Sequence, residues 1–550
     1  HERVGPSRLG YCLWALVEFQ RGEFNMNSVI GTIGGTVNMA EAILGPSLAR
    51  GQANDIAIYF GDGTVTYGEL VQRVNQTGNA MLELGLDRGD RVLLMIKDSP
   101  NFLYAHLGTM KIGAVAVALN LRLSSADLKY TIEDSEASVL ILDEIFIGIY
   151  EDIADSLDQP LKVITADEKL PAYDHLPDLL ADTSDDLEPA AMKPEDPAFW
   201  SYSSGTTGSP KGVVHVHKMI RGVNYLFGEF FGIGPGDRVY GTSKLFFAYS
   251  LGHCYHAALS VGASVVLFPD WPDAEVVAEV VDKYRPTVLL SVPTFYRNLV
   301  RNGVASNESF QQVRYYISAG EKLPEALFDE WRDATGQPIY EGIGATETVN
   351  LFLSNGPGAV KAGTCGKITP GTEVKLIGQD GEIVTEPDTP GVLWTRMESI
   401  ADSYWKLPEK SSEVFQDGWY CTNDSFTFDA DGWYEYQGRA DDMLKISGQW
   451  VSPTEIEDHV LRHEKVFEAA VVGVANEDGL IRLVMFMVTQ EAKDARVALE
   501  KEVQDSLVAQ LSIYKCPRRI IHVDSMPTTA TGKLQRHALR EQAAQAIIDI

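Results

Sequence analysis

The chain has 550 residues, of which 45% are hydrophobic and 22% are charged, and its formal net charge is −31. A negative field of this size repels nucleic acids and anionic membranes, so neither is expected as a partner. The apolar fraction is that of a folded protein, and no stretch reaches the roughly 20 apolar residues that span a bilayer. A chain of this length is expected to fold as two or more structural units.

The first residues are interpreted as a leader, and the cysteine pattern indicates a cellular location. Residues 1–25 precede the first methionine, Met26, and carry no secretory pattern. We interpret them as upstream sequence or a leader added in cloning, and leave them out of the fold. The cysteines are scattered without C-x-x-C spacing, which fits a reducing, cytoplasmic location and argues against a structural zinc. They are Cys12, Cys254, Cys365, Cys421 and Cys516.

From about residue 64 to residue 300 the sequence alternates between helical and strand-like patterns. Short apolar runs bounded by turn residues predict buried strands at residues 91–96, 137–142 and 263–268. Helical segments are expected at residues 67–86 and 273–284. Strands that alternate with helices predict α/β layers with largely parallel sheets.

The composition changes after Gly391. Asp, Gly and aromatic residues predict short hairpins at residues 416–420 and 429–434. Beyond residue 440 a new βα pattern begins, with a helix from about residue 453 and a strand at 469–474. We therefore expect an α/β fold with two parts. A large N-terminal domain, residues 26–439, holds layered α/β subdomains and a β-rich subdomain, and a small α+β domain spans residues 440–550.

Residues 203–212 form a loop with three glycines, several hydroxyl residues and one lysine, Lys211. Glycines let successive backbone N–H groups converge on phosphate oxygens, hydroxyls add donors, and the lysine adds positive charge. The spacing is not that of a Walker A loop, in which the lysine is followed by Ser or Thr. The segment therefore predicts a phosphate-binding loop. Its candidate ligands are Ser203, Ser204, Gly205, Thr206, Thr207, Gly208 and Lys211.

This loop resembles the phosphate loop of the adenylate-forming superfamily, which includes acyl-CoA synthetases, luciferases and the adenylation domains of peptide synthetases. The other signatures of that family follow in order across residues 64–536. The resemblance implies an AMP-forming ligase that uses ATP, Mg²⁺ and coenzyme A. A small carboxylic acid first becomes an acyl-adenylate, and the CoA thiol then displaces AMP. A monomer or a homodimer is expected.

Residues 342–347 come one glycine short of a dinucleotide-binding pattern, because Glu347 stands at the last position. The resemblance makes Glu347 a ligand of Mg²⁺, a role that suits a hard carboxylate ligand. It also makes Asp424 and Arg439 the ribose contacts, with Asn423 at a turn position where the family has glycine. The ATP site so implied also contains Ala319, Gly320, Glu321, Glu341, Gly342, Ile343, Gly344 and Thr346.

The resemblance assigns the last motif, at residues 527–533, to adenylation. Lys533 would stabilise charge on the α-phosphate, so it joins Thr206 and Glu347 as the expected catalytic residues. The small domain is expected to be mobile and to rotate about Asp441 between the two half-reactions. The loop that would then line the CoA channel contains Lys445, Ser447, Gly448, Gln449 and Trp450.

An aromatic motif at residues 244–252 looks closest to the benzoate–CoA ligase branch of the family. The implied acid pocket consists of Phe247, Ala248, Tyr249, Gly344, Asn350 and Leu351. Asn350 stands where that branch is expected to have histidine. Its amide either binds a hydroxyl or amino substituent of the acid or only supports the loop.

Two alternatives to an aromatic acid–CoA ligase stay open: an enzyme that loads a carrier-protein thiol, and a ligase for a small hydroxy or alicyclic acid. A nucleotide-binding regulatory protein descended from a ligase is disfavoured, because the catalytic groups are all present. The cluster His253, Cys254 and His256 is not expected to bind a metal, since no second cluster supplies further ligands.

Overall fold

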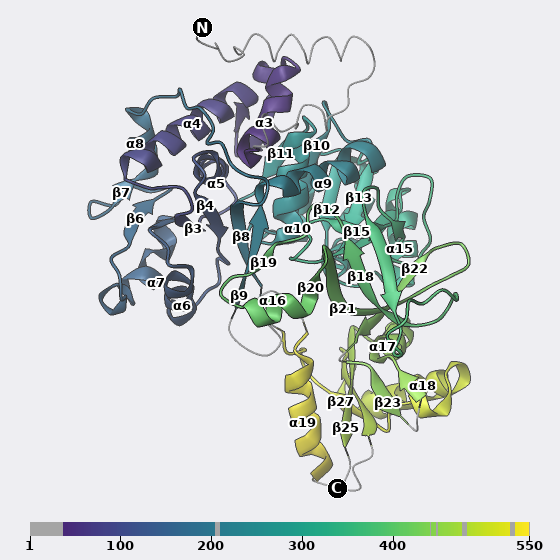
Figure 1. Cartoon of the computed structure of the whole chain (residues 1–550). Coiled ribbons are helices and arrows are strands. Elements are labelled where there is room, and N and C mark those ends of the chain that lie inside the picture. The colour runs from purple at the N-terminus through teal and green to yellow at the C-terminus, as the bar shows by residue number, and fades with distance from the viewer. Residues whose placement is uncertain are drawn as a thin grey trace.

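The computed structural model describes residues 37–203, 210–440, 442–446, 449–475, 481–528 and 534–548. The predicted leader at residues 1–25 lies outside this part of the chain. The fold comprises two large sheets flanked by helices, a third antiparallel sheet and a small C-terminal unit (Figure 1). This arrangement confirms the predicted fold class.

The first large sheet has eight strands. In spatial order they are β19 (Ser403–Tyr404), β9 (Lys211–Val216), β8 (Pro197–Ser203), β4 (Val115–Ala118), β3 (Arg91–Met95), β5 (Val139–Leu142), β6 (Lys162–Thr165) and β7 (Asp174–His175). Apart from Arg91 at the start of β3, strands β3, β4 and β5 are apolar, because helices cover both faces of the parallel part. Helices α4 (Tyr67–Glu83) and α5 (Pro100–Lys111) lie on one side, and α6 (Ser125–Ser135) and α7 (Ile147–Glu151) on the other (Figure 1).

The second large sheet has nine strands. In spatial order they are β16 (Lys367–Ile368), β15 (Leu351–Ser354), β14 (Ile339–Gly344), β13 (Tyr315–Ser318), β12 (Val288–Ser291), β10 (Arg238–Gly241), β11 (Ser264–Leu267), β1 (Ile56–Phe60) and β2 (Gly63–Thr66). Neighbours from β14 to β1 run parallel, whereas β14 and β15 form an antiparallel hairpin that carries residues 345–350.

Helices pack around these two sheets. Besides α4 to α7, the helices that precede β8 are α3 (Met39–Ala49) and α8 (Leu176–Ala181). The helices between β9 and β14 are α9 (Ile220–Asn224), α10 (Ala248–Ser250), α11 (Ala258–Ser260), α12 (Ala274–Tyr284), α13 (Pro293–Arg301), α14 (Glu308–Gln311) and α15 (Glu325–Thr335). Two π-helical segments, η5 (Tyr225–Phe230) and η6 (Leu251–Ala257), lie in the same stretch of the chain.

The predicted elements agree with the structure except at their ends. The helix expected over 67–86 starts at Tyr67, behind a capping box of Thr66 and Glu69, and ends at Glu83. Gly85 follows with φ +85°, a left-handed conformation that stops the helix. The helix expected from residue 273 begins at Ala274, because the side chain of Asp273 caps it.

The third sheet is antiparallel and corresponds to the predicted β-rich subdomain. Its strands are β17 (Glu373–Ile377), β18 (Gly391–Arg396), β21 (Trp419–Phe428), β20 (Phe415–Gln416) and β22 (Tyr434–Arg439), and α16 (Pro408–Val414) precedes β20. The two predicted hairpins are β20–β21 and β21–β22. The first turns through Asp417 and Gly418, both with positive φ, as a tight hairpin requires.

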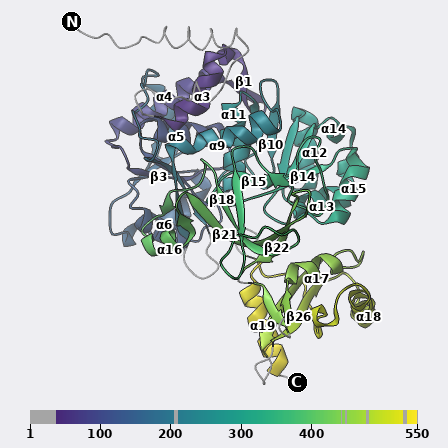
Figure 2. The same cartoon turned by 45° about the vertical axis from the view of Figure 1, so that its right-hand side comes forward.

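The residues after 442 form sheets that share no strand with those before them in the described chain. They contain β23 (Leu444–Ile446), β24 (Gln449–Val451), β25 (Glu468–Ala475), β26 (Ile481–Val488) and β27 (Arg519–His522), with α17 (Pro453–Val460), α18 (Lys493–Gln510) and α19 (Arg536–Ile548). This unit lies below the rest of the molecule in both views (Figures 1 and 2). Among the described residues, no helix is both long and apolar enough to cross a bilayer.

Candidate active site

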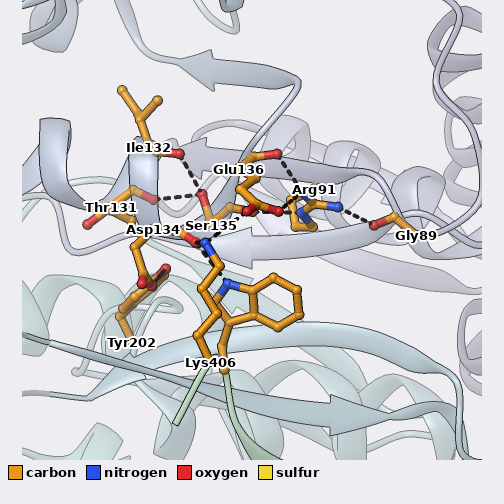
Figure 3. A network of polar contacts seen from close by, with 10 residues as sticks. Gly89, Arg91, Thr131, Ile132, Asp134, Ser135, Glu136, Tyr202 and Lys406 are labelled. Atoms are coloured by element: carbon orange, nitrogen blue, oxygen red, sulfur yellow. Dashed lines mark hydrogen bonds and ion pairs between the residues drawn. The ribbon is translucent and has the colours of Figure 1, made fainter. Parts of the chain in front are cut away.

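The predicted phosphate loop joins β8 to β9, and hydrogen bonds to the end of α6 hold the base of the loop. Ser203 and Lys211 pair across the antiparallel strands at the base of the loop. The hydroxyl of Tyr202 donates a 2.6 Å hydrogen bond to the carboxylate of Asp134, and the indole of Trp405 donates to the carbonyl of Asp134 at 2.8 Å. Figure 3 shows this network, in which the end of α6 anchors the strand that leads into the loop.

Glu347 lies in the β14–β15 turn. Tyr404 contacts both its carboxylate and Lys211, the first residue of β9. The Tyr404 hydroxyl donates to Oε1 of Glu347 at 2.7 Å, and Lys211 Nζ lies 4.1 Å from the centre of the Tyr404 ring. Burial and the Glu347 charge raise the pKa of Tyr404, and likewise that of Tyr420, well above its ordinary value. Both phenols therefore stay protonated. The expected metal ligand and the phosphate-loop lysine are thus joined through one tyrosine.

A histidine of the loop stem supports the same turn. His215 Nε2 lies 3.0 Å from the carbonyl oxygen of Thr346, the residue before Glu347. Its ring stacks on Phe199 of β8 with the centroids 4.7 Å apart. Burial lowers the pKa of His215 to about 3, so the ring is neutral and Nε2 carries its one proton as the donor. Strand β9 therefore fixes the backbone that presents Glu347.

The donor chemistry of this site fits Mg²⁺. A magnesium ion bound with ATP takes one or two carboxylates and fills its other positions with phosphate oxygens and water. Within the described ranges, no group of three or more His, Cys, Asp and Glu side chains is placed to hold a metal by itself. Glu347 offers one such carboxylate, and its role as a ligand of Mg²⁺ stays a prediction.

Asp424 and Arg439 face each other on neighbouring strands. They are partners in the β21–β22 register, and Arg439 Nη1 lies 3.2 Å from Asp424 Oδ1. Asn423 lies within β21, where the register with β18 shifts, and not at the predicted turn; its φ of +56° is the left-handed conformation for which asparagine substitutes well for glycine. A carboxylate beside a guanidinium at this point suits the two hydroxyls of a ribose, and that assignment remains a prediction.

The segment after β13 passes close to β14. Gly320 has φ +89°, and the neighbouring Glu321 accepts a 2.8 Å hydrogen bond from the hydroxyl of Thr294. Glu341 is buried, and its carboxylate accepts a 3.0 Å hydrogen bond from the backbone N–H of Leu323. Burial raises the pKa of Glu341 to about 8. Its side chain therefore holds residues 319–323 against β14.

The residues of the predicted acid pocket converge from two directions. Phe247 occupies the N-cap position of α10, Ala248 is its first residue, and the hydroxyl of Tyr249 donates to the carbonyl of Ile317 at 3.1 Å. From the other side, the β14–β15 turn brings Gly344, where a Cβ atom would lie 2.5 Å from the carbonyl oxygen of Asn350. Only glycine permits this approach, so the turn closes tightly at the pocket.

The amide of Asn350 is occupied by the protein. Nδ2 donates to the carbonyl of Gly222 at 2.9 Å, and Oδ1 accepts the N–H of Leu351 at 2.9 Å. Oδ1 also lies 3.2 Å from His253 Nε2. Of the two roles left open from the sequence, these contacts favour support of the loop. Tyr404, His215 and His253 were not predicted for this site. Tyr404 and His253 reach it through tertiary contacts alone, whereas His215 follows the phosphate loop in β9.

Only part of the expected CoA channel lies among the described residues. In the β23–β24 hairpin, Lys445 pairs with Trp450, and Ile446 pairs with Gln449. The predicted site residues that lie outside the described part of the chain are Ser204, Gly205, Thr206, Thr207, Gly208, Asp441, Ser447, Gly448 and Lys533.

Comparison with known proteins places these features in a family. The model for the AMP-binding enzyme family matches residues 47–405, and the model for its C-terminal domain matches residues 455–533. A 3-hydroxybenzoate–CoA ligase of Aromatoleum sp. (strain CIB) is 49% identical over 507 residues, which are 92% of this chain and 97% of the relative. A benzoate–CoA ligase of Thauera aromatica is 38% identical over 506 residues, 92% and 95% of the two chains. The crystal structure of the anthranilate CoA ligase AuaEII with anthranoyl-AMP superimposes with a TM-score of 0.85 at 34% identity, covering 95% of this chain and 99% of that one.

Proposed function

This chain belongs to the AMP-binding enzyme family, in the benzoate–CoA ligase branch of the adenylate-forming superfamily, and we propose that its substrate is a hydroxybenzoate. It is an ATP-dependent ligase that joins an aromatic acid to coenzyme A with release of AMP and pyrophosphate. The choice of a hydroxybenzoate is supported by the higher identity to a 3-hydroxybenzoate–CoA ligase, 49%, than to a benzoate–CoA ligase, 38%.

One observation carries the proposed chemistry: the meeting of Lys211 and Glu347 on Tyr404. The lysine at the base of the phosphate loop and the carboxylate of the β14–β15 turn contact the same phenol, one through its ring and one through its hydroxyl. A polyphosphate beside them would find a positive charge on one side and a carboxylate suited to its metal on the other. This arrangement supports the binding of Mg·ATP rather than of a free anion.

In the first half-reaction, a carboxylate oxygen of the acid attacks the α-phosphorus of ATP, and pyrophosphate leaves. Mg²⁺ held by Glu347 would neutralise charge on the phosphate oxygens. We assign Lys211, with the donors of residues 203–208, to holding the β- and γ-phosphates, and Asp424 with Arg439 to holding the ribose. Lys533 stabilises the charge that develops on the pentavalent phosphorus, a role assigned from the family motif.

In the second half-reaction, the thiol of CoA attacks the carbonyl carbon of the acyl-adenylate, and AMP leaves. We propose that the unit after residue 440 reorients about Asp441 between the two steps, so that the β23–β24 hairpin replaces Lys533 at the site. The cytoplasmic location and the monomeric or dimeric state also remain predictions from the sequence.

The direct test is ATP–pyrophosphate exchange with benzoate, 3- and 4-hydroxybenzoate, 2-aminobenzoate, cyclohexanecarboxylate and a short hydroxy acid. Thioester formation is then measured with CoA and, separately, with a carrier protein bearing the pantetheine arm. We expect exchange with the benzoates, fastest with a hydroxybenzoate, and thioester with free CoA. Exchange confined to aliphatic acids, or thioester formed only on the carrier protein, would overturn the proposal.

A further inference from the structure

The ring of His253 lies between two oxygen atoms, and this arrangement leaves one of its nitrogens without a matched partner. His253 belongs to the π-helical segment η6, a type of helix often found at functional sites. Nδ1 lies 2.8 Å from the carbonyl oxygen of Tyr249, and Nε2 lies 3.2 Å from Oδ1 of Asn350. Both partner atoms are hydrogen-bond acceptors, so each calls for a proton on the histidine nitrogen that faces it.

The orientation of the Asn350 amide is settled by its backbone partners. Oδ1 accepts the N–H of Leu351, and Nδ2 donates to the carbonyl of Gly222. Turning the amide over would place an amino group against an N–H and an oxygen against a carbonyl, and both hydrogen bonds would be lost. The atom that faces His253 Nε2 is therefore an oxygen.

A neutral imidazole has one N–H, so it can satisfy only one of the two oxygens. The contact with Tyr249 is the shorter, which places the proton on Nδ1 and leaves a lone pair on Nε2 facing Asn350 Oδ1. Burial lowers the pKa of His253 to about 4, so a second proton is not supplied near neutral pH. Two lone pairs then face each other 3.2 Å apart in a buried place, a mismatch that a donor placed beside both atoms would relieve.

The surroundings identify the source of such a donor. The rings of Tyr249 and Phe227 lie 5.2 Å and 5.8 Å from the His253 ring and offer apolar surface. Tyr249 and Asn350 are both predicted walls of the acid pocket, and His253 contacts both of them. The mismatch therefore lies beside two residues of the predicted acid pocket.

We propose that His253 is the specificity-determining residue of the acid pocket, and that its Nε2 accepts a hydrogen bond from a hydroxyl on the aromatic ring of the substrate. The inference rests on the proposed function and names the group that distinguishes hydroxybenzoate from benzoate. Asn350 then serves as a positioning residue: it ties the β14–β15 turn to α9 and leaves the direct contact to His253. A ring that lacks a donor would leave the two lone pairs unmatched, which is how a polar site rejects an apolar analogue.

The test compares 3-hydroxybenzoate with 3-fluorobenzoate, and the corresponding 4-substituted pair, because fluorine is small and cannot donate. The ratio of kcat/KM values within a pair is measured for the wild type, His253→Phe and His253→Gln. We expect the wild type to prefer the hydroxyl of one pair by about 10- to 100-fold, His253→Phe to lose most of that ratio, and His253→Gln to restore part of it, since its amide oxygen can accept. Cys254→Ala, the neighbouring position in η6, controls for disturbance of the segment and should keep the wild-type ratio.

The outcomes separate this inference from the function on which it rests. If the wild type turns over no aromatic acid, the proposed function fails. If it turns over both members of each pair equally well, or if His253→Phe lowers both by the same factor, the role of His253 is wrong while the proposed function stands. The ratios measured for the wild type can contradict the inference by themselves, so the test holds even if a variant fails to fold.

Discussion

Replacing Tyr404 by phenylalanine tests the link between Lys211 and Glu347. The substitution removes the hydroxyl that donates to Glu347 at 2.7 Å and keeps the ring under Lys211 Nζ, 4.1 Å from its centre. The two functions of the tyrosine are therefore separated. Glu347 keeps its place in the turn, because the N–H of Ala401 still donates to its backbone carbonyl at 2.7 Å.

The size of the effect follows from the kind of hydrogen bond. Tyr404 and Glu347 are both buried, and a hydrogen bond to a charged group contributes about 1.5–3 kcal/mol. If that bond orients the carboxylate toward the metal, its loss weakens apparent binding of Mg·ATP by roughly 10- to 150-fold, at 1.4 kcal/mol for each factor of ten. Maximal velocity should recover in large part when magnesium is raised, since the lysine and the phosphate loop are unchanged.

The assay is ATP–pyrophosphate exchange at saturating acid, followed over a magnesium titration for the wild type and Tyr404→Phe. Tyr173→Phe serves as the matched control, because Tyr173 makes a comparable 3.1 Å hydrogen bond to a glutamate, Glu151, on an exposed surface. Half-saturation by magnesium within twofold of the wild type would show that the Tyr404 hydroxyl does not orient Glu347 for the metal. So would a loss of activity fully accounted for by a lower melting temperature of the variant.

Three further predictions concern acid stability, the small unit and the ribose contact. His256 is buried, and burial lowers its pKa well below the ordinary value, so it stabilises the fold above pH 6.5 and loses that contribution as the pH falls. His256→Leu should therefore narrow the difference in unfolding free energy between pH 7.5 and pH 5 by about 2 kcal/mol, measured by urea denaturation; an unchanged difference contradicts it. Asp458→Asn removes the 2.6 Å ion pair that ties α17 to Lys322 and should speed tryptic cleavage near residues 440–446 about fivefold or more, whereas an unchanged rate would count against that pair as a restraint. Asp424→Asn should raise KM for ATP about tenfold with little effect on KM for the acid, and equal changes in both would argue against a ribose contact.

Much of this protein could be predicted without the structure. Apolar runs at residues 91–96, 137–142 and 263–268 mark strands because a strand buried on both faces requires them, and the structure has strands there. Element ends were harder, since a cap such as Asp273 or a glycine such as Gly85 decides them within one residue. The phosphate loop was predicted from its own residues, because chemistry that depends on backbone shape leaves short, contiguous motifs, whereas the roles of Glu347, Asp424 and Arg439 were predicted from the resemblance to the adenylate-forming superfamily.

The tertiary structure alone decided how these motifs meet. Tyr404 stands 57 positions from Glu347, and Asn350 stands 97 positions from His253 and 128 from Gly222. No local periodicity records such hydrogen bonds, because each depends on which loops the two large sheets bring together. The motifs in the chain were therefore enough to indicate the chemistry, in which an acid is activated with ATP. The contacts of Asn350 and His253 decided which atom beside the predicted acid pocket keeps an unmatched lone pair, on which the proposed recognition of the substrate hydroxyl rests.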